Sequence, residues 1–314
     1  MQSTSNLVVV LGTGGTIAGT AAAPDEGVGY RAAQLGVDQL LQAVPMLAGQ
    51  PLESDQLVQL DSKDMDHATW LLLARRVAHH LSRPEVKGIV VTHGTDTLEE
   101  TAYFLHRVLA PAKPVVMTAA MRPATALSAD GPQNLLDAVT VAHCDGAAGV
   151  VAVMGGTVFH AEDLRKVHTY QLAAFSSGEA GPVGLVQEGR LRVFRCWPVG
   201  NALGVDRLPA DVTSWADVAL VLSHAGVSGM LVDALIGTGV RGIVVAGTGN
   251  GTLHRELVPA LQRAQLAGVT VWRASRCAEG AVIGDEGDFA SAGALSALQA
   301  RIELMLRLSV SGQG

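Results

Sequence analysis

Two threonine-rich segments carry side chains that could do chemistry on a small molecule. Residues 12–19 read GTGGTIAG and residues 92–100 read THGTDTLEE, and each segment follows an apolar run. In the first segment the glycines allow close approach of the backbone to a ligand, while Thr13 and Thr16 offer hydroxyl groups. A threonine hydroxyl becomes an effective nucleophile only beside a base. The pattern favours hydroxyl-dependent chemistry with a second polar group close by.

The first segment also has a nucleotide-binding interpretation. The dinucleotide fingerprint requires a third glycine where Ile17 stands and a helix that opens at once, and the following residues are loop-like instead. The phosphate-binding pattern GxxxxGK[ST] is absent from the sequence as well. The sequence therefore disfavours a nucleotide role.

The second segment has an ordinary structural interpretation as a helix start. Asp96 with Glu99 would form a capping box, and so would Thr97 with Glu100. On these residues alone the cap is favoured over catalysis. The same helix start would also offer free backbone N–H groups to an anion or an oxyanion, so both roles can coexist in one turn.

Short β-branched runs alternate with helical patterns and must position these segments. Near-continuous apolar strands are typical of a parallel sheet with helices on both faces. The predicted strands are residues 7–11, 57–60, 88–92, 114–118 and 149–154, and the clearest helices are residues 66–81 and 97–109, the latter ending before Pro111. Such sheets place their ligands at the carboxyl ends of the strands. We predict an α/β fold with a larger N-terminal, mostly parallel sheet flanked by helices.

A second, smaller α/β domain is predicted after a change in composition. Residues 195–213 are rich in proline and glycine, as expected of an interdomain linker. Beyond them we predict strands at residues 217–222, 242–246 and 269–272 and helices at residues 228–236, 253–267 and 294–308. The chain of 314 residues exceeds the usual size of a single core. We expect domains at residues 1–194 and 214–314, joined by the linker.

Composition and charge disfavour several classes of partner. The net charge is −7 and the 22 Lys and Arg residues form no basic run, so we expect no nucleic-acid partner. No apolar stretch reaches the roughly 18 residues of a membrane helix, so we expect no membrane association. The first residues lack the pattern of a signal peptide, which predicts a cytoplasmic protein.

Cysteines and histidines give no sign of a metal site. Cys144, Cys196 and Cys277 are odd in number and widely spaced, which favours reduced thiols over disulfides or a metal knuckle. The histidines lack the helical spacing with glutamate that a zinc site shows. We expect no metal.

Five segments, in order along the chain, together resemble the bacterial-type L-asparaginases of the asparaginase/glutaminase amidohydrolase family. They are residues 12–19 (GTGGTIAG), 61–65 (DSKDM), 92–103 (THGTDTLEETAY), 114–131 (PVVMTAAMRPATALSADG) and 247–252 (GTGNGT). The first and third are signature regions of the family, and the resemblance covers nearly the whole chain. It implies hydrolysis of the side-chain amide of L-asparagine to L-aspartate and ammonia, without a cofactor. Family members differ in their weaker activity on glutamine.

The resemblance implies two catalytic groups of residues. Thr16 resembles the hydroxyl nucleophile, and Tyr30 resembles its phenolic partner on a mobile loop. Thr95, Asp96 and Lys166 resemble a second group, in which the lysine activates a threonine or water. A lysine can act in this way when burial favours its neutral amine. From the glycines and missing periodicity of residues 20–30, we expect that loop to close over bound substrate.

The resemblance also implies the substrate-binding residues. Ser62 and Asp96 resemble the groups that hold the α-carboxylate and the α-ammonium. Lys63 departs from the family, which commonly has an uncharged or acidic residue there. A cation at this position could repel the α-ammonium or turn to the α-carboxylate. Asn250 and Glu286 resemble residues that a neighbouring subunit lends to the site, which implies a homo-oligomer built as a dimer of dimers.

Two other function classes use the same scaffold. A non-catalytic amino-acid sensor would most simply lack one of the hydroxyls or Lys166, and all are present here. An amidotransferase subunit that feeds ammonia to a partner enzyme would be expected to carry an extra N-terminal module, whereas this sequence starts just before its first predicted strand. Ammonia release from free asparagine by the protein alone would separate the three classes.

Overall fold

The chain forms two compact units. A computed structural model describes residues 6–23, 29–284 and 289–311. The units comprise Met1–Val205 and Asp206–Gly314, so their boundary falls within the stretch 195–213 that has a linker-like composition.

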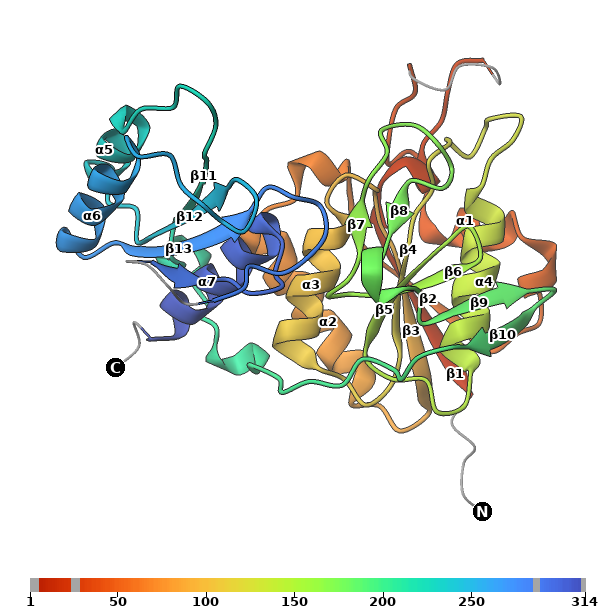
Figure 1. Ribbon diagram of the computed structural model, residues 1–314. Helices are drawn as coiled ribbons and strands as arrows, with labels where there is room; N and C mark the ends of the chain where they lie inside the picture. Colours follow the sequence, from red (N-terminus) through yellow and green to blue (C-terminus); the bar gives the residue numbers. More distant parts are fainter. Residues whose placement is uncertain (1–5, 24–28, 285–288, 312–314) are drawn as a thin grey trace. The chain divides into compact units, whose positions relative to one another are not determined.

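The first unit is built on an eight-stranded sheet with the strand order β10-β9-β6-β5-β4-β3-β1-β2. Its five parallel strands are β1 (Leu7–Gly14), β2 (Leu52–Leu60), β3 (Val86–Thr92), β4 (Val115–Thr118) and β5 (Val150–Met154). Three antiparallel strands extend the sheet beyond β5, namely β6 (Thr157–His160), β9 (Gly184–Gln187) and β10 (Arg190–Val193). The carboxyl ends of β1 to β5 therefore meet along one edge, at the top of this unit in Figure 1.

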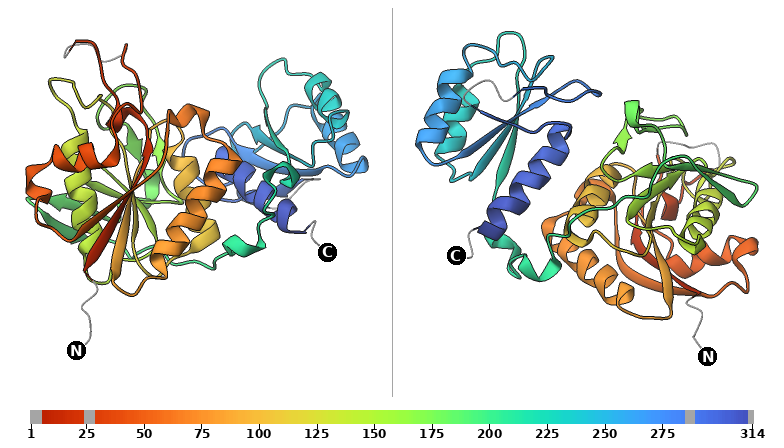
Figure 2. Two further views of the ribbon diagram at one scale, coloured as in Figure 1. Left: turned by 180° about the vertical axis from the view of Figure 1, so that it is seen from behind. Right: turned by 60° about the horizontal axis from the view of Figure 1, so that its bottom comes forward.

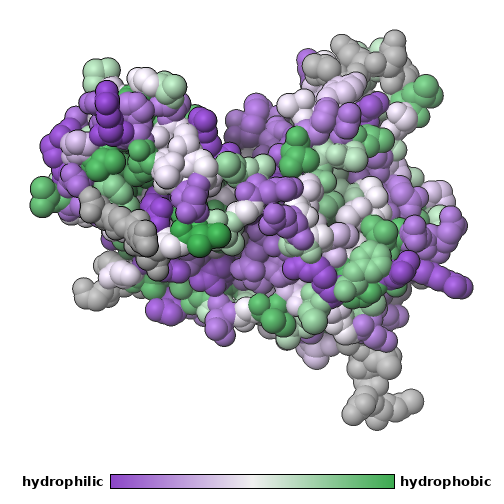
Figure 3. Space-filling view, in the orientation of Figure 1, coloured by the Kyte–Doolittle hydropathy of each residue, from purple (hydrophilic) through white to green (hydrophobic). Residues whose placement is uncertain are grey.

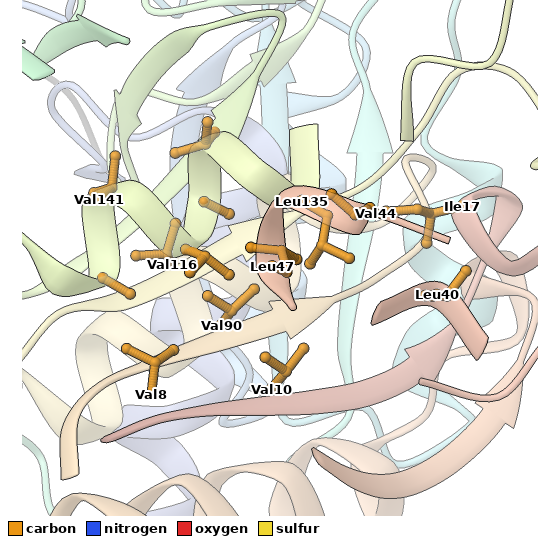
Figure 4. Close-up of a cluster of buried hydrophobic side chains, with 14 of the residues drawn as sticks. Val8, Val10, Ile17, Leu40, Val44, Leu47, Val90, Val116, Leu135 and Val141 are labelled. Atoms are coloured by element: carbon orange, nitrogen blue, oxygen red, sulfur yellow. The ribbon is translucent and has the colours of Figure 1, made fainter. Parts of the chain in front are cut away.

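Helices cover both faces of this sheet (Figures 1 and 2). Helices α2 (His67–Leu81) and α3 (Leu98–Leu109) lie on one face, and α1 (Val37–Gln42) and α4 (Gly131–His143) lie on the other. Alternate residues of a strand point to opposite faces, so a strand buried on both sides is apolar throughout. In β1, Val8 and Val10 pack under α4 and α1, in the cluster shown in Figure 4.

Local sequence signals explain where the long helices begin and end. Asp66 caps α2, because its carboxylate accepts a hydrogen bond of 2.8 Å from Thr69 N. Helix α3 ends at Leu109, because the next residue, Ala110, takes a left-handed conformation with φ 35° just before Pro111. The predicted end of that helix is confirmed.

The edge strand β10 is not buried on both faces, unlike the inner strands. Its residues are exposed or half-buried, and Val193 and Phe194 at its end are 45% and 46% exposed. Figure 3 shows apolar side chains at the surface near this strand. A four-residue strand without a buried face gives little periodic signal.

The second unit contains a four-stranded parallel sheet. Its strands are β11 (Val218–Leu222), β12 (Gly242–Gly247), β13 (Thr270–Ser275) and β14 (Ala290–Ser291), in that order. Helices α5 (Met230–Ile236) and α6 (Val258–Leu266) pack on one face, and α7 (Ala297–Ser311) packs on the other. Helix α6 begins later than the predicted residue 253, because residues 253 and 254 are irregular and residues 255–257 form a turn. The predicted α/β fold class is confirmed.

The structure contains no disulfide among its described cysteines. Cys144, Cys196 and Cys277 are all free. Within the described ranges, no helix is long and apolar enough to span a bilayer, and no group of three or more His, Cys, Asp or Glu side chains could hold a metal ion.

Candidate active site

Glycines bring three strand ends together at the carboxyl edge of the larger sheet. Gly15 has φ +80°, and a Cβ atom there would collide with the backbone of Gly94. A Cβ atom on Gly94 would in turn collide with the Oγ atom of Ser62. The turns after β1 and β3 therefore touch almost backbone to backbone, and the Ser62 side chain from the turn after β2 packs against Gly94, an approach that only glycine permits.

The turn after β1 carries a hydroxyl pair. Thr16 lies in a single 3₁₀ turn, Thr16–Ala18, and is only 6% exposed. Its Oγ1 atom lies 2.7 Å from the Oη atom of Tyr30, and either atom can donate. Two backbone hydrogen bonds of 2.9 Å between Thr20 and Arg31 close the loop that bears Tyr30. Residues 24–28 of the expected lid lie outside the described residues.

The turn between β3 and α3 carries the second group. Lys166 Nζ donates to Thr95 Oγ1 at 2.9 Å and to Asp96 Oδ1 at 2.6 Å. Thr95 is 6% exposed, whereas the Asp96 side chain is 54% exposed. Thus Lys166 connects a buried hydroxyl to a carboxylate that remains open to a ligand.

Ser62 joins the turn after β2 to the start of α3. It lies in the 3₁₀ turn Ser62–Asp64 and is 2% exposed. Its Oγ atom accepts a hydrogen bond of 3.2 Å from Asp96 N, and its carbonyl accepts one of 2.8 Å from Thr97 Oγ1. The residues predicted to bind the α-carboxylate and the α-ammonium are therefore direct neighbours.

Lys63 is held by its acidic neighbours. Its Nζ atom donates to Asp61 Oδ2 at 2.8 Å and to Asp64 Oδ2 at 3.1 Å, and the side chain is 61% exposed. The hydrogen bond to Asp61 raises the pKa of Lys63 above its ordinary value. The cation is therefore already paired in the absence of substrate.

The capping-box interpretation of this helix start is wrong. Helix α3 has no side-chain hydrogen bond at its N-cap, Thr97, because that hydroxyl donates to Ser62 O instead. Asp96 accepts from Lys166 Nζ, and Glu99 Oε2 accepts a hydrogen bond of 2.6 Å from Lys166 N. Thr97, Asp96 and Glu99 thus bond to Ser62 and Lys166, which are distant in sequence, and not to the backbone at the start of α3.

Thr13 does not present its hydroxyl to a ligand. Its Oγ1 atom donates to Thr92 O at 2.8 Å, and the residue is 1% exposed. This bond links β1 to β3, so of the two threonines of the first segment only Thr16 offers a hydroxyl to the site.

Asn250 belongs to the second unit, where its amide contacts the backbone of Ile283. Its Oδ1 atom accepts from Ile283 N at 2.7 Å, and its Nδ2 atom donates to Ile283 O at 2.8 Å. The residue is exposed, and its contribution to a neighbouring subunit stays a prediction. Glu286 lies outside the described residues.

Sequence reasoning missed two groups beside the site. Glu99 was assigned only a capping role, although its Oε2 atom accepts from Lys166 N. Burial raises the pKa of the Glu99 carboxyl. His93 is fully buried, and burial lowers its pKa to about 4, so it is neutral near pH 7. No local sequence pattern indicates that Glu99 or His93 lies beside the site.

The family models match both units. Residues 7–198 match the family described as "Asparaginase, N-terminal". Residues 217–313 match the family described as "Glutaminase/Asparaginase C-terminal domain". The chain belongs to the asparaginase/glutaminase family. It is therefore an amidohydrolase of that family, and the resemblance found in its sequence is confirmed.

Full-length relatives of this amidohydrolase are similar in sequence and structure. A glutaminase-asparaginase of Pseudomonas fluorescens biotype A is 38% identical over 96% of this chain and 86% of its own length. The L-asparaginase 2 of Escherichia coli strain K12 is 38% identical over 96% and 88%. The crystal structure of a probable cytoplasmic L-asparaginase from Campylobacter jejuni is 36% identical, with a TM-score of 0.91 over 96% of this chain and 95% of its own.

Proposed function

We propose that this amidohydrolase converts L-asparagine to L-aspartate and ammonia, with weaker activity on L-glutamine. The observation that carries the proposal is the contact of Lys166 Nζ with both Thr95 and Asp96, beside the Thr16–Tyr30 pair. This arrangement supplies two hydroxyls, a lysine to activate one of them and a carboxylate for a cation. A small amino acid with a side-chain amide offers an amide carbon to the hydroxyls and an α-ammonium to the carboxylate.

In the proposed reaction, the two hydroxyl groups act on successive steps. Thr16 Oγ1 attacks the amide carbon, and its proton passes through Tyr30 to the departing ammonia. Water then attacks the resulting ester, and its proton passes through Thr95 to Lys166 Nζ. The Thr16 oxygen leaves and takes the proton of the new carboxyl group through Tyr30, and Lys166 passes its proton to the released ammonia. L-Aspartate and ammonium are thus formed, and both hydroxyl groups return to their starting state. A direct attack by water is the alternative order of events.

Substrate binding in this proposal uses the start of α3 and the turn after β2. The backbone N–H groups there attract the α-carboxylate, which Ser62 Oγ also contacts. The half-exposed carboxylate of Asp96 accepts from the α-ammonium. Because Lys63 is paired with Asp61 and Asp64, we expect it to affect affinity less than a free cation would.

The preference for asparagine over glutamine is the finer part of the proposal. Relatives of equal identity are named glutaminase-asparaginase and L-asparaginase 2. The two substrates differ by one methylene, which changes binding in a pocket by only about 1–3 kcal/mol. We therefore expect both activities, with the ratio of kcat/KM favouring asparagine.

We further propose that the protein works as a homo-oligomer, a dimer of dimers. The support is the resemblance of residues 247–252 to the turn whose asparagine completes a neighbouring site in the family. In this chain Asn250 is exposed and holds the backbone of Ile283 through two hydrogen bonds. Two-fold symmetry would then give each pair of subunits two equivalent shared sites.

Subunit mixing tests the shared site. Thr95→Val and Asn250→Ala proteins are each expected to be inactive, and exchange of their subunits should restore activity, because one site of each heterodimer is intact. Full activity of a monomer, or no recovery after proven exchange, would contradict the shared site.

We also propose a cytoplasmic location, supported by the absence of a signal-peptide pattern in the first residues and by the three free thiols. The similar proteins include one named as probably cytoplasmic and one named as probably periplasmic. Fractionation of the source cells would decide between the two compartments.

The experiment that tests the function is ammonia release by the purified protein from asparagine and from glutamine. An amidohydrolase releases ammonia with no other protein present, a sensor binds without release, and an amidotransferase subunit requires its partner. Thr140→Val is a matched control, because Thr140 donates to Leu136 O within α4. Binding of asparagine without ammonia release would refute the proposal.

A further inference from the structure

The strand that carries Lys166 is not part of the main sheet. Strands β7 (Arg165–Lys166) and β8 (Phe175–Ser176) form a separate two-stranded sheet. Beyond them, Val167 N donates to Ala174 O at 2.8 Å. These bonds hold the hairpin to itself. The position of Lys166 relative to α3 depends on contacts that cross from the hairpin to the helix.

Three hydrogen bonds from Lys166 make that crossing. Its Nζ atom donates to Thr95 and Asp96, and its backbone N–H donates to Glu99 Oε2 at 2.6 Å. The three acceptors lie within five consecutive residues around the start of α3. Only the bond to Glu99 leaves the amine of Lys166 free to change its partner or its protonation state.

We propose that Glu99 is a positioning residue that fixes Lys166 through its backbone N–H. This inference rests on the proposed role of Lys166 in activating Thr95. An amine that must release and regain a proton in each turnover cannot rely on its own ion pair to stay in place. A carboxylate bonded to the backbone of the same residue holds the amine within reach of Thr95 throughout the cycle.

The surroundings of Glu99 fit a fixed acceptor. Burial raises the pKa of this carboxyl, while the Lys166 N–H and the nearby Arg165 guanidinium favour its charged form. Arg165 is itself fixed, since its Nη1 atom donates to the carbonyls of Glu162 and Leu164 at 2.9 and 2.8 Å. An acceptor inside such a set of contacts has little freedom to turn elsewhere.

Three substitutions separate the reach of this side chain from its charge. Glu99→Gln keeps a carbonyl oxygen at the same reach without the charge, Glu99→Asp keeps the charge one methylene too short, and Glu99→Ala removes both. We expect kcat of the glutamine variant within about threefold of wild type, and kcat of the other two lower by about 30- to 100-fold, the scale of a small misplacement of a catalytic group. KM should change little, because Ser62 and Asp96 are untouched.

A second measurement reports the position of Lys166 without activity. The rate at which an amine-reactive acylating reagent labels Lys166, followed by mass spectrometry of the peptide, should rise in the alanine and aspartate variants and stay unchanged in the glutamine variant. Asp137→Asn is a matched control, because Asp137 is another buried carboxyl, bonded to Gln133 in α4. That control should change neither kcat nor labelling.

The outcomes distinguish this inference from the proposed function. Unchanged kcat and labelling in Glu99→Ala overturn the positioning role, and so does a ranking in which Glu99→Asp exceeds Glu99→Gln. If Glu99→Ala does not fold, the aspartate and glutamine variants decide alone. Lys166→Met is measured in parallel. Should it retain wild-type activity, the proposed role of Lys166 fails, while the labelling rates still decide whether Glu99 positions it.

Discussion

Replacing Thr95 by valine removes one hydroxyl oxygen from a buried site and leaves the shape of the side chain intact. Thr95 is 6% exposed, and its Oγ1 atom accepts from Lys166 Nζ at 2.9 Å. After the substitution, Lys166 keeps its bonds to Asp96 and Glu99. We expect the free energy of unfolding to fall by about 1 kcal/mol, the net value of one hydrogen bond, against a typical total of about 5–15 kcal/mol. The fold should survive.

The same substitution should nearly abolish catalysis. Loss of a nucleophile or of its activating group costs about 10³-fold or more in kcat/KM, which corresponds to about 4 kcal/mol of transition-state stabilisation. Thr16→Val should behave likewise, because its hydroxyl pairs with Tyr30. The difference between about 4 and about 1 kcal/mol distinguishes a chemical role from a structural one.

Ammonia release and urea unfolding, followed by circular dichroism, measure the two effects on the same samples. Thr140→Val is the control, because it removes an equivalent hydroxyl that bonds within α4. Both catalytic variants should show native dichroism at low urea. Retention of more than about a tenth of the wild-type kcat/KM by either variant would refute the role given to that hydroxyl.

Three further predictions concern pH, the glycine contact and the departure from the family pattern. Since burial lowers the pKa of His93 to about 4, the unfolded chain binds the extra proton below about pH 6.5, and stability should fall by roughly 3 kcal/mol between pH 6.5 and 4. His93→Gln should show a weaker fall in its urea midpoint over that range. Gly15→Ala should lower the free energy of unfolding, measured in urea, by at least about 1 kcal/mol and impair activity, because of its φ of +80° and its collision with Gly94; an unchanged free energy of unfolding would contradict the close approach. Lys63→Gln should leave the melting temperature unchanged and alter KM by less than about tenfold, because the cation is exposed and already paired; a larger change would place Lys63 at the substrate.

The inner strands of both sheets could be predicted because burial on two faces leaves a continuous apolar signal. The run Val8–Val9–Val10–Leu11 is fully buried, and its register against β3 pairs Val9 with Ile89. The antiparallel strands β9 and β10 were not predicted, since Arg190 and Arg192 in β10 are exposed and break the apolar run. Pairing with neighbours, and not an intrinsic pattern, makes these residues a strand.

The site shows the same division between local and distant signals. Thr16 and Lys166 were assigned through the family resemblance, and the structure places Thr16 beside Tyr30 and Lys166 beside Thr95 and Asp96. Their catalytic roles remain a proposal. What the structure adds is the physical connection, because neither pair is close in sequence.

Glu99 shows why the local pattern misled. Its position three residues after Asp96 matches a capping box, and a cap is the least costly way to satisfy a helix start within one segment. The hairpin that bears Lys166 instead supplies a backbone donor from 67 residues away. Because Glu99 bonds this donor, it forms no capping box, and α3 has no side-chain cap. The missing cap costs on the order of 1 kcal/mol of stability. The bonds from Thr97 to Ser62 and from Lys166 to Asp96 and Glu99 instead join the turn after β2, the start of α3 and the hairpin. The side chains that could have capped the N-terminus of α3 therefore hold together three separate segments of the candidate site.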